Sequence, residues 1–198
     1  MEDEPEQRRY HHGGLRAALL DAAERRVRTD GAAQLSLRDL AREVGVSHAA
    51  PRRHFADRQE LLDALAEDGF GRLGESIRTA LADADAEFAA RTRGAASAFA
   101  HFATENPALL ALMNATKHRA ASGTARAAEV AFAPIVELIR EGQTTRVLQA
   151  GDPEELGLVL YATINGITML VATNTVPVER LDELTDTAVD QFLRGAAG

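Results

Sequence analysis

Residues 36–55 have the sequence SLRDLAREVGVSHAAPRRHF, and this run carries the clearest structural signal in the chain. Leu40 and Val44 lie four positions apart and so share one face of a helix. Ser36 is a favourable N-cap residue, and Gly45 is suited to the left-handed conformation that ends many helices. The pattern therefore predicts a short helix between these two residues.

A second short helix is predicted directly after Gly45. Only Val46 intervenes before Ser47, which is a natural N-cap residue, and the helix is expected to reach Phe55. Pro51 falls in its first turn, where the missing N–H removes at most one weak backbone hydrogen bond. Two short helices joined by a turn that contains glycine are typical of the helix-turn-helix motif, whose second helix enters the major groove of DNA.

Helical periodicity continues on both sides of this motif, whereas the alternating pattern of β-strands is absent. A preceding helix that contains Leu15 and Leu19 is expected to end near Gly31. Asp57 opens a capping box for a longer helix that reaches about Ala84. Later patterns predict helices at 88–102, at 108–115, at 123–141, after Asp152 and at 179–193. The predicted fold class is therefore all-α.

Composition narrows the range of functions. The chain has 198 residues, of which 45% are hydrophobic and 26% charged, as in an ordinary globular protein. It contains no cysteine, which excludes disulfides, thiolate metal sites and cysteine catalysis. No histidine pair has the spacing of metal ligands, and no phosphate loop or nucleophile elbow is present. We therefore expect no enzymatic activity, no cofactor and no metal, and the polar first ten residues favour a cytoplasmic protein without a secretory leader.

Charge is distributed unevenly along the chain. The formal net charge is −8, yet residues 7–60 contain eleven arginines against seven acidic residues and so carry +4. The acidic residues outnumber the basic ones in the remainder of the chain. A basic segment joined to an acidic body favours nucleic-acid binding by the basic segment alone.

One uncharged stretch, residues 156–178, is long enough to span a bilayer. It contains several polar residues, among them Tyr161, Asn165 and Thr168, and a prolyl residue, Pro177. We therefore expect no membrane span, but a helix of a soluble protein that is buried on all sides.

Residues 15–65 resemble the DNA-binding domain of the TetR/AcrR family of transcriptional regulators. The resemblance rests on four groups of residues at matching spacing, namely 37–41 (LRDLA), 44–47 (VGVS), 54–55 (HF) and 61–62 (LL). It implies an N-terminal three-helix helix-turn-helix domain followed by a larger helical ligand-binding and dimerisation domain. The expected boundaries are a flexible acidic tail at 1–10, the DNA-binding domain at 11–58 and the helical domain at 59–198.

The resemblance and the shape of the major groove together predict the residues that contact DNA. His48, Ala49 and Ala50 open the recognition helix, where side chains meet base edges. Arg38 matches a family position that can reach a guanine. Contacts to phosphate are expected from Ser36, Ser47, Arg52, Arg53, His54 and Arg58. The family usually has Tyr in place of Arg52 and Lys in place of Arg58, so base preference does not transfer from relatives.

The resemblance also implies a ligand cavity among the middle helices, mostly apolar with a few polar groups. Asn165 and Thr168 share a helical face with Tyr161, and polar groups embedded in apolar helices must be paired when buried. Asn165 fits a pocket lining and a satisfied core position equally well, and the aromatic residues also suit a plain core. The predicted set is Phe99, Phe102, Leu109, Met113, Asn114, Phe132, Tyr161, Asn165, Thr168 and Met169.

A dimer interface is expected from the last two helices. Apolar residues of the uncharged helix lie on a different side from Tyr161, and the final helix has one apolar face. The family implies that these surfaces form a four-helix interface between two copies. The predicted residues are Ile164, Ile167, Val171, Leu181, Leu184, Ala188 and Phe192.

These features lead to one main functional hypothesis and one alternative. The main hypothesis is a homodimeric repressor that binds a palindromic double-stranded operator and is released by a small-molecule effector. The effector would act by repositioning the helix at about 57–84. The alternative is a helical small-molecule binding protein whose DNA-binding motif is degenerate, and the replacement of the usual Tyr by Arg52 is its support.

Overall fold

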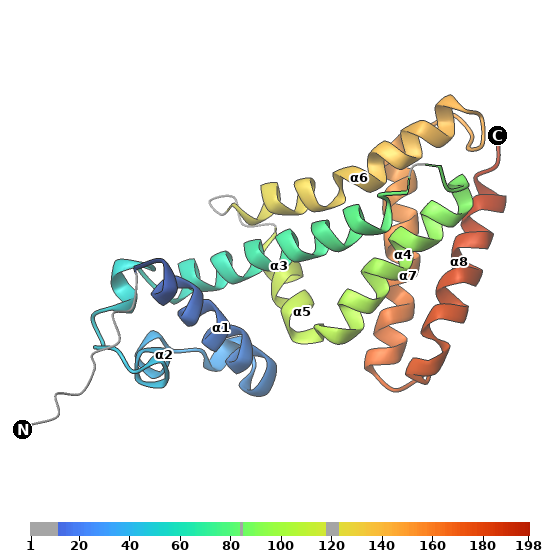
Figure 1. Cartoon of the computed structure of the whole chain (residues 1–198). Coiled ribbons are helices and arrows are strands. Elements are labelled where there is room, and N and C mark those ends of the chain that lie inside the picture. The colour runs from blue at the N-terminus through green and yellow to red at the C-terminus, as the bar shows by residue number, and fades with distance from the viewer. Residues whose placement is uncertain (1–11, 84, 118–122) are drawn as a thin grey trace, which may run out of the picture. The chain divides into compact units, whose positions relative to one another are not determined.

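The computed structural model describes residues 12–83, 85–117 and 123–198, and the predicted tail at 1–10 lies outside them. In this part of the chain every regular element is a helix, which confirms the all-α fold class (Figure 1). The α-helices are α1 (His12–Asp30), α2 (Leu37–Val44), α3 (Arg58–Ala80), α4 (Phe88–Glu105), α5 (Pro107–Thr116), α6 (Thr124–Thr144), α7 (Pro153–Ala172) and α8 (Leu181–Gly195). Short 3₁₀ helices are η1 (Ala32–Gln34), η2 (Pro51–Arg53) and η3 (Val178–Arg180).

Local sequence signals place several helix ends correctly. Gly45 ends α2 in the left-handed region with φ 76°, as predicted. The backbone N–H of Glu60 donates to Asp57 Oδ1 at 2.9 Å, which is the capping bond expected at the start of α3. At the start of α7 the N–H of Glu154 donates to Asp152 Oδ1 at 2.8 Å. Ser36 occupies the N-cap position of α2, although its hydroxyl makes no capping bond.

The chain divides into two compact units, which meet within α3 between Leu65 and Ala66. The first unit contains α1, α2, η2 and the beginning of α3. Its core consists of apolar side chains that these elements bury completely or nearly so, including Leu19, Leu40, Phe55, Leu61 and Leu65. Burial of such side chains is the main force that holds short helices together, because helices of this length are only marginally stable alone.

The predicted second helix of the motif is shorter and more tightly wound than expected. Most of its backbone bonds join residues three apart, as from Ala50 N–H to Ser47 O (3.0 Å) and from Arg53 N–H to Ala50 O (3.2 Å), and one bond of the α-helical kind follows, from Phe55 N–H to Pro51 O (2.9 Å). Only η2 within this segment is helical. Pro51 provides the physical reason, because it has no N–H to donate to Ser47 O and so interrupts the α-helical bonding pattern. The short helix predicted to reach Phe55 is therefore present only as the 3₁₀ helix η2, which ends at Arg53.

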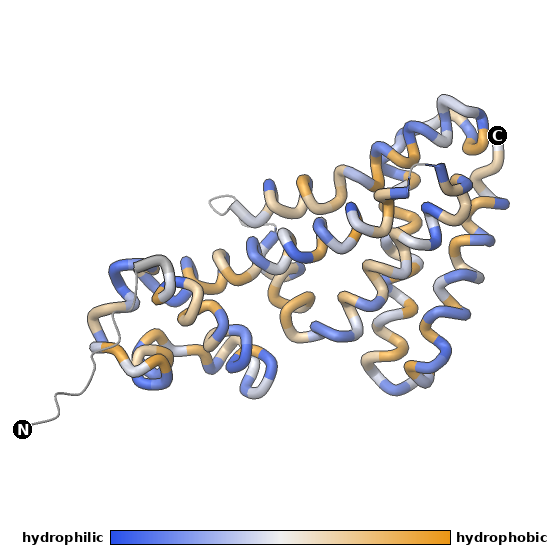
Figure 2. The backbone as a smooth tube through the Cα atoms, in the orientation of Figure 1, coloured by the Kyte–Doolittle hydropathy of each residue, from blue (hydrophilic) through white to orange (hydrophobic). Residues whose placement is uncertain are grey.

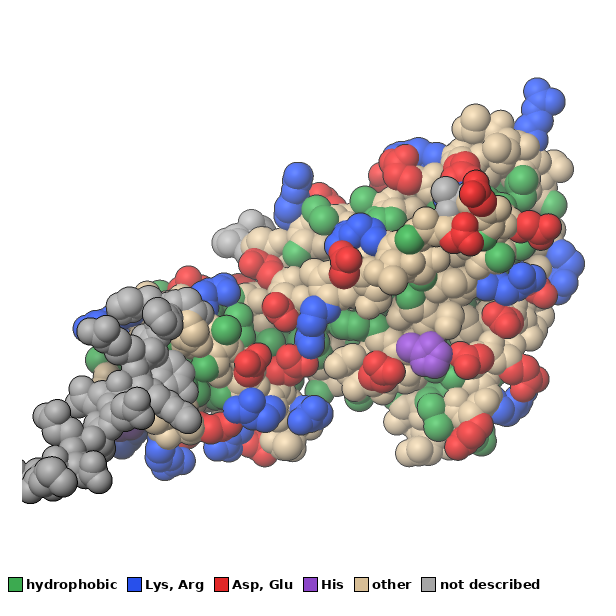
Figure 3. Space-filling model, viewed as in Figure 1, with side chains coloured by type: hydrophobic (Ala, Val, Ile, Leu, Met, Phe, Trp, Pro, Cys, Tyr) green, Lys and Arg blue, Asp and Glu red, His purple; other side chains and the backbone are tan. Residues whose placement is uncertain are grey.

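In the second unit α4, α7 and α8 pack against one another, and α6 lies against α7. The buried core of this unit includes Phe99, Met113, Leu138, Ile164 and Val189. Two polar contacts connect the surfaces of α4 and α8, an ion pair between Arg93 and Asp190 at 2.6 Å and a hydrogen bond between His101 Nε2 and Asp182 Oδ1 at 2.8 Å. Hydrophobic and hydrophilic segments alternate along the helices in Figure 2, and acidic and basic side chains intersperse over the face seen in Figure 3.

Helix α7 has an exposed apolar face, so the expectation that it is buried on all sides is wrong. Leu158 is 64% exposed, and Val159 and Met169 are 58% and 59% exposed. By length and composition alone it is the one helix of the described residues that matches a membrane span. Composition does not distinguish a helix enclosed by its own chain from one with a free side, and α7 belongs to the second kind.

Candidate nucleic-acid interface and ligand pocket

The residues predicted to contact DNA all lie in the first unit, on or directly beside α2 and η2, in the turn between them and at the start of α3. Six are exposed to solvent: Arg38, Ser47, His48, Ala49, Arg52 and Arg53. The other four are half-buried: Ser36, Ala50, His54 and Arg58. The local fold therefore presents most of this set on its surface.

The arginines of the first unit fall into two groups. Arg38, Arg52 and Arg53 form no ion pair with any other residue that the structure describes. By contrast, Arg25 and Arg26 are engaged with carboxylates of their own unit. An unpaired, exposed guanidinium can bind a phosphate or a guanine edge without first breaking an internal contact. These three arginines were predicted from the sequence to contact DNA, whereas Arg28, which is also exposed and has no ion pair among the described residues, was not.

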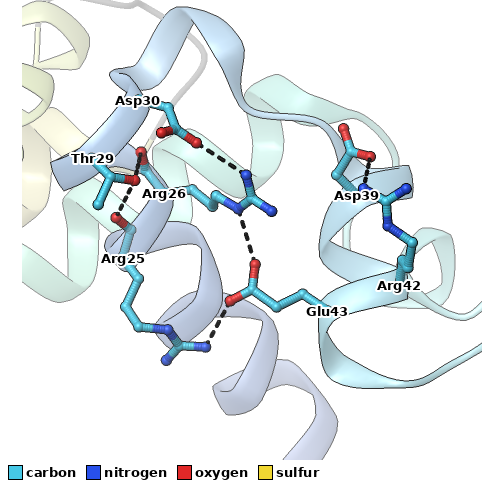
Figure 4. Close-up of polar contacts among 7 residues, drawn as sticks. All are labelled: Arg25, Arg26, Thr29, Asp30, Asp39, Arg42 and Glu43. Atoms are coloured by element: carbon cyan, nitrogen blue, oxygen red, sulfur yellow. Dashed lines mark hydrogen bonds and ion pairs between the residues drawn. The ribbon is translucent and has the colours of Figure 1, made fainter.

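An ion-pair network fixes α2 against α1 (Figure 4). One oxygen of Glu43 accepts from Arg25 Nη2 and the other from Arg26 Nε, both at 3.0 Å, and Arg26 Nη1 also donates to Asp30 at 3.0 Å. Because α2 carries Arg38, this network helps to set the position from which Arg38 faces solvent. The hydrogen bonds from Arg26 and Arg25 hold the pKa of Glu43 below its ordinary value of 4.5.

We expect the substitution Glu43→Gln to lower the stability of the protein by a modest amount at neutral pH. The folded-state pKa of Glu43 is depressed, so its stabilising effect is complete above pH 4.5 and disappears as the pH falls through the lower folded value. Urea unfolding of both proteins from pH 7 downward measures this. The difference at pH 7 should be smaller than the roughly 2–5 kcal/mol expected for truncation of buried Leu40 to Ala. A difference that grows as the pH falls would contradict the assignment.

Arg58 has a structural role that the sequence did not reveal. Its Nε donates to the carbonyl oxygen of Leu35 at 3.0 Å, and its Nη2 donates to the carbonyl oxygen of Ala32. These two bonds fasten the start of α3 to the segment around η1. A lysine, with its single nitrogen, does not reproduce this fork of two donors. The predicted contact of Arg58 with phosphate would therefore have to come from its remaining guanidinium donors.

The second unit contains a pocket of about 820 Å³ between α4, α6 and α7. Three predicted ligand residues meet in its wall, namely Phe99, Phe132 and Tyr161. Their ring centroids lie 5.3–6.2 Å apart in tilted or edge-on arrangements, which are favourable for aromatic pairs. A concave, mainly apolar wall with a few polar groups is the usual form of a small-molecule site.

A polar cluster of three residues adjoins this wall. The oxygen Oδ1 of Asn114 accepts hydrogen bonds from Tyr161 OH at 3.3 Å and from Lys117 Nζ at 3.1 Å. The ammonium of Lys117 also lies 5.6 Å from the centroid of the Tyr161 ring. Burial raises the pKa of the Tyr161 phenol, and the hydrogen bond to Asn114 opposes this effect only in part. Tyr161 is thus a neutral hydrogen-bond donor at physiological pH.

The other predicted ligand residues do not line the pocket. Phe102, Leu109 and Met113 are buried in the core. A Cβ at Gly69 would lie 2.8 Å from the Met113 sulfur, so this side of α5 packs closely against α3. Half-buried Asn165 accepts a hydrogen bond at its carbonyl from buried Thr168, whereas Met169 is exposed. Helical spacing identifies residues that share a face, but it does not separate a pocket wall from close packing.

The predicted dimer residues also divide by burial. Ile164, Val171, Leu181 and Ala188 are buried within their own chain. Ile167, Leu184 and Phe192 are half-buried, and Phe192 packs against the cluster of Ile139, Leu148 and Ala196. The exposed apolar residues of α7 lie on a different face, which contains Leu158, Ala162 and Gly166.

Comparison with known proteins accounts for both units. Residues 19–65 match the family model described as bacterial regulatory proteins of the tetR family. Residues 92–192, half of the chain, match the model described as a tetracyclin repressor-like C-terminal domain. The chain belongs to the TetR family. It is a transcriptional regulator of that family with a helix-turn-helix domain.

Relatives of this TetR-family regulator occur among curated proteins and solved structures. An HTH-type transcriptional regulator from Mycobacterium tuberculosis is 32% identical over 100 residues, which are 50% of this chain and 43% of that protein. The match thus spans less than half the length of the curated relative. A Rhodococcus sp. RHA1 protein with unknown function is 43% identical, with a TM-score of 0.88 over 97% of this chain and 100% of that chain. The TetR family regulator PfmR from Thermus thermophilus, at 22% identity and a TM-score of 0.70 over 89% of this chain and 97% of that chain, shares the fold.

Within the TetR-family fold, sequence analysis missed the residues that act through long-range contacts. Glu43 lies 17 and 18 positions from its two arginine partners, and Arg58 lies 23 and 26 positions from its carbonyl acceptors. Lys117 was also missed. The residue type itself could have drawn attention to Lys117, because it is the single lysine in a chain whose other 21 basic residues are arginine.

Proposed function

We propose that this TetR-family regulator binds a palindromic double-stranded operator as a homodimer, represses transcription, and is released by a small-molecule effector. The observation that carries the proposal is the pair of features in the two units. Unpaired, exposed arginines lie in the helix-turn-helix unit, and an aromatic-lined pocket of about 820 Å³ lies in the other. The first suits the backbone and base edges of DNA, and the second suits an apolar ligand.

The proposed dimer uses the exposed face of α7. Leu158, Val159, Ala162, Gly166 and Met169 all lie exposed on that helix, and none of them carries a charge. A contiguous apolar surface of this kind marks an interaction site in a soluble protein. A two-fold dimer joins identical faces, and it also matches the symmetry of a palindromic site. We therefore place the proposed interface on this face, next to half-buried Ile167 of the same helix.

Effector release is proposed to pass through α3. This helix begins at Arg58, beside the DNA-binding motif, and its residue Ile77 lines the pocket. A ligand that prefers one position of α3 shifts the population toward that position. The energetic requirement is only this difference in affinity between the two states.

The proposal is tested by fluorescence anisotropy of the purified protein with the DNA upstream of its own gene, at two salt concentrations. We expect specific binding with a Kd of about 10⁻⁸ M or tighter, as operator sites show. Three unpaired arginines in each of two subunits predict a slope of log K against log salt of roughly −5. A scrambled duplex of the same length is the control.

Footprinting of the same DNA gives the second part of the test. The expected result is a protected inverted repeat whose half-sites lie about one helical turn apart or a multiple of it. Equal affinity for the operator and the scrambled duplex would contradict sequence-specific regulation. Absence of binding even at low salt would favour a helical small-molecule binding protein with a degenerate motif.

A further inference from the structure

The pocket of the second unit is an elongated groove. Its α6 wall extends from Ala125 to Arg140, which corresponds to about 22 Å along a helix axis. Between these ends the wall is made largely of apolar side chains such as Ala128, Phe132 and Val136. A groove of this length and polarity suits a ligand with an extended apolar part rather than a compact polar molecule.

The charged groups of the groove are arranged asymmetrically. Glu129, Glu137 and Glu154 line it, but all three are in contact with solvent, and Arg140 is paired with Glu137. Lys117 is half-buried and forms no ion pair with any other residue that the structure describes. The half-buried charge of the groove is therefore a cation with no counter-ion among the described residues.

The contacts of α5 and α6 place this cation at one end of the groove. The hydroxyl of Thr124, at the start of α6, donates to the carbonyl oxygen of Thr116 at 2.9 Å, and Lys117 is the next residue along the chain. Lys117 thus lies near the Ala125 end, and the Arg140–Glu137 pair lies at the other. The half-buried cation therefore stands at one end of a mainly apolar groove, whose other charged groups are the solvent-exposed carboxylates of Glu129, Glu137 and Glu154 and the paired Arg140.

The contacts of the ammonium favour an anionic partner over a cationic one. One of its three donors binds Asn114 Oδ1, and the face of the Tyr161 ring is already covered by the same ammonium at 5.6 Å. A ligand cation directed to that ring would meet a like charge, whereas a carboxylate would accept the remaining donors. Asn114 acts here as a positioning residue, because its oxygen holds both Lys117 and Tyr161.

We infer that the effector is an amphiphile with one carboxylate head, which pairs with Lys117, and an unbranched or extended apolar tail, which lies between α6 and α7. This inference rests on the proposed function of the pocket as the effector site. It adds the chemical class of the ligand, the end of the groove that takes the head group and the residue that selects for its charge.

The test compares three probes that share a decyl chain, namely decanoate, decanol and decyltrimethylammonium, by isothermal titration calorimetry below their self-association concentrations. Decanoate should bind the wild-type protein about tenfold or more tightly than decanol, because a hydrogen bond to a charged group is worth more than a neutral one. Decyltrimethylammonium should bind most weakly. Shortening decanoate to octanoate should weaken binding roughly fourfold for each methylene removed from the apolar groove.

Variants at the two ends of the groove locate the head group. Lys117→Met should bring the affinity for decanoate down to that for decanol, with little change for decanol itself, and Lys117→Arg should keep the preference for decanoate. The matched control is Arg140→Met, which removes a cation from the opposite end and should leave the preference in place. Unchanged affinity for decanol also shows that each variant is folded.

Three results would overturn the inference, and they differ in what they imply for the pocket. Equal binding of all three probes, or strongest binding of decyltrimethylammonium, refutes the carboxylate while the pocket remains a ligand site. Loss of the preference in Arg140→Met but not in Lys117→Met refutes the placement of the head group. Failure of every probe to bind the wild-type protein, or binding that Ala128→Trp leaves unchanged, refutes ligand binding in this groove altogether.

Discussion

Joint replacement of Arg38 and Arg52 by alanine should weaken operator binding at least about 100-fold. Neither side chain forms an ion pair with another described residue, so their loss leaves the folded unit almost unchanged. A bidentate contact of arginine with guanine contributes about 1–3 kcal/mol of discrimination, and a dimer makes each contact twice. Fluorescence anisotropy with the footprinted operator measures the loss.

The matched control for this variant is Arg42→Ala. Arg42 is an exposed arginine on the same helix as Arg38, but it is paired with Asp39 at 3.2 Å, so its loss removes the same charge without removing a proposed contact. We expect its affinity for the operator to change by only a few-fold. The loss of the two Arg52 side chains of a dimer should also reduce the salt slope by roughly two. An equal loss of affinity in Arg42→Ala would show a general charge effect and would contradict the contact assignment.

Gly166→Arg should convert the proposed dimer into monomers and reduce operator affinity by about 10²–10⁴-fold. A Cβ at this position meets no atom within 4 Å, so the change leaves the fold of the single chain intact. In a dimer, however, the long charged side chain would lie in the middle of the exposed apolar face of α7. Two linked DNA-binding units gain affinity from their connection, and monomers lose this gain. Analytical ultracentrifugation and operator titration test the two parts of the prediction.

Gly71→Arg provides the control for the dimer variant. Gly71 is also an exposed helical glycine with open space at its Cβ position, but it lies on α3 rather than on α7. This variant should remain dimeric and should bind the operator as the wild type does. Dimers of normal stability in Gly166→Arg would remove the interface from this face of α7.

The parts of the fold that local chemistry determines were predictable from the sequence. The end of α2 follows from Gly45, because a left-handed glycine acts on its own neighbourhood, and the helix begins directly after Ser36 as predicted, although the hydroxyl of Ser36 makes no capping bond. The extent of the short helix after Ser47 was overestimated. The sequence shows Pro51, but the effect of its missing N–H on the helix depends on which carbonyl group loses its α-helical hydrogen bond. The exposed face of α7 was not predictable, since its composition equals that of a core helix.

The candidate sites were also predictable only in part. Phe99, Phe132 and Tyr161 were expected near a ligand and line one pocket, because aromatic residues that share apolar faces tend to meet between helices. The roles of Lys117 and Arg58 were not predictable, because both depend on partners brought together by tertiary structure. The hydrophobic periodicity of a sequence does not show which side chains on different helices form hydrogen bonds with each other.

The 3₁₀ helix at Pro51 changes which of the side chains predicted to contact DNA lie on the same side of the backbone. In an α-helix residues four apart share a side, so His48 would align with Arg52. A chain bonded at intervals of three residues instead brings positions three apart into line, so Ala50, whose carbonyl accepts from Arg53 N–H, aligns with Arg53. A small side chain then stands beside a long cationic one on the surface that is predicted to contact DNA. We therefore expect that the operator preferences of a relative with a regular α-helix at this place would not apply to this chain position by position.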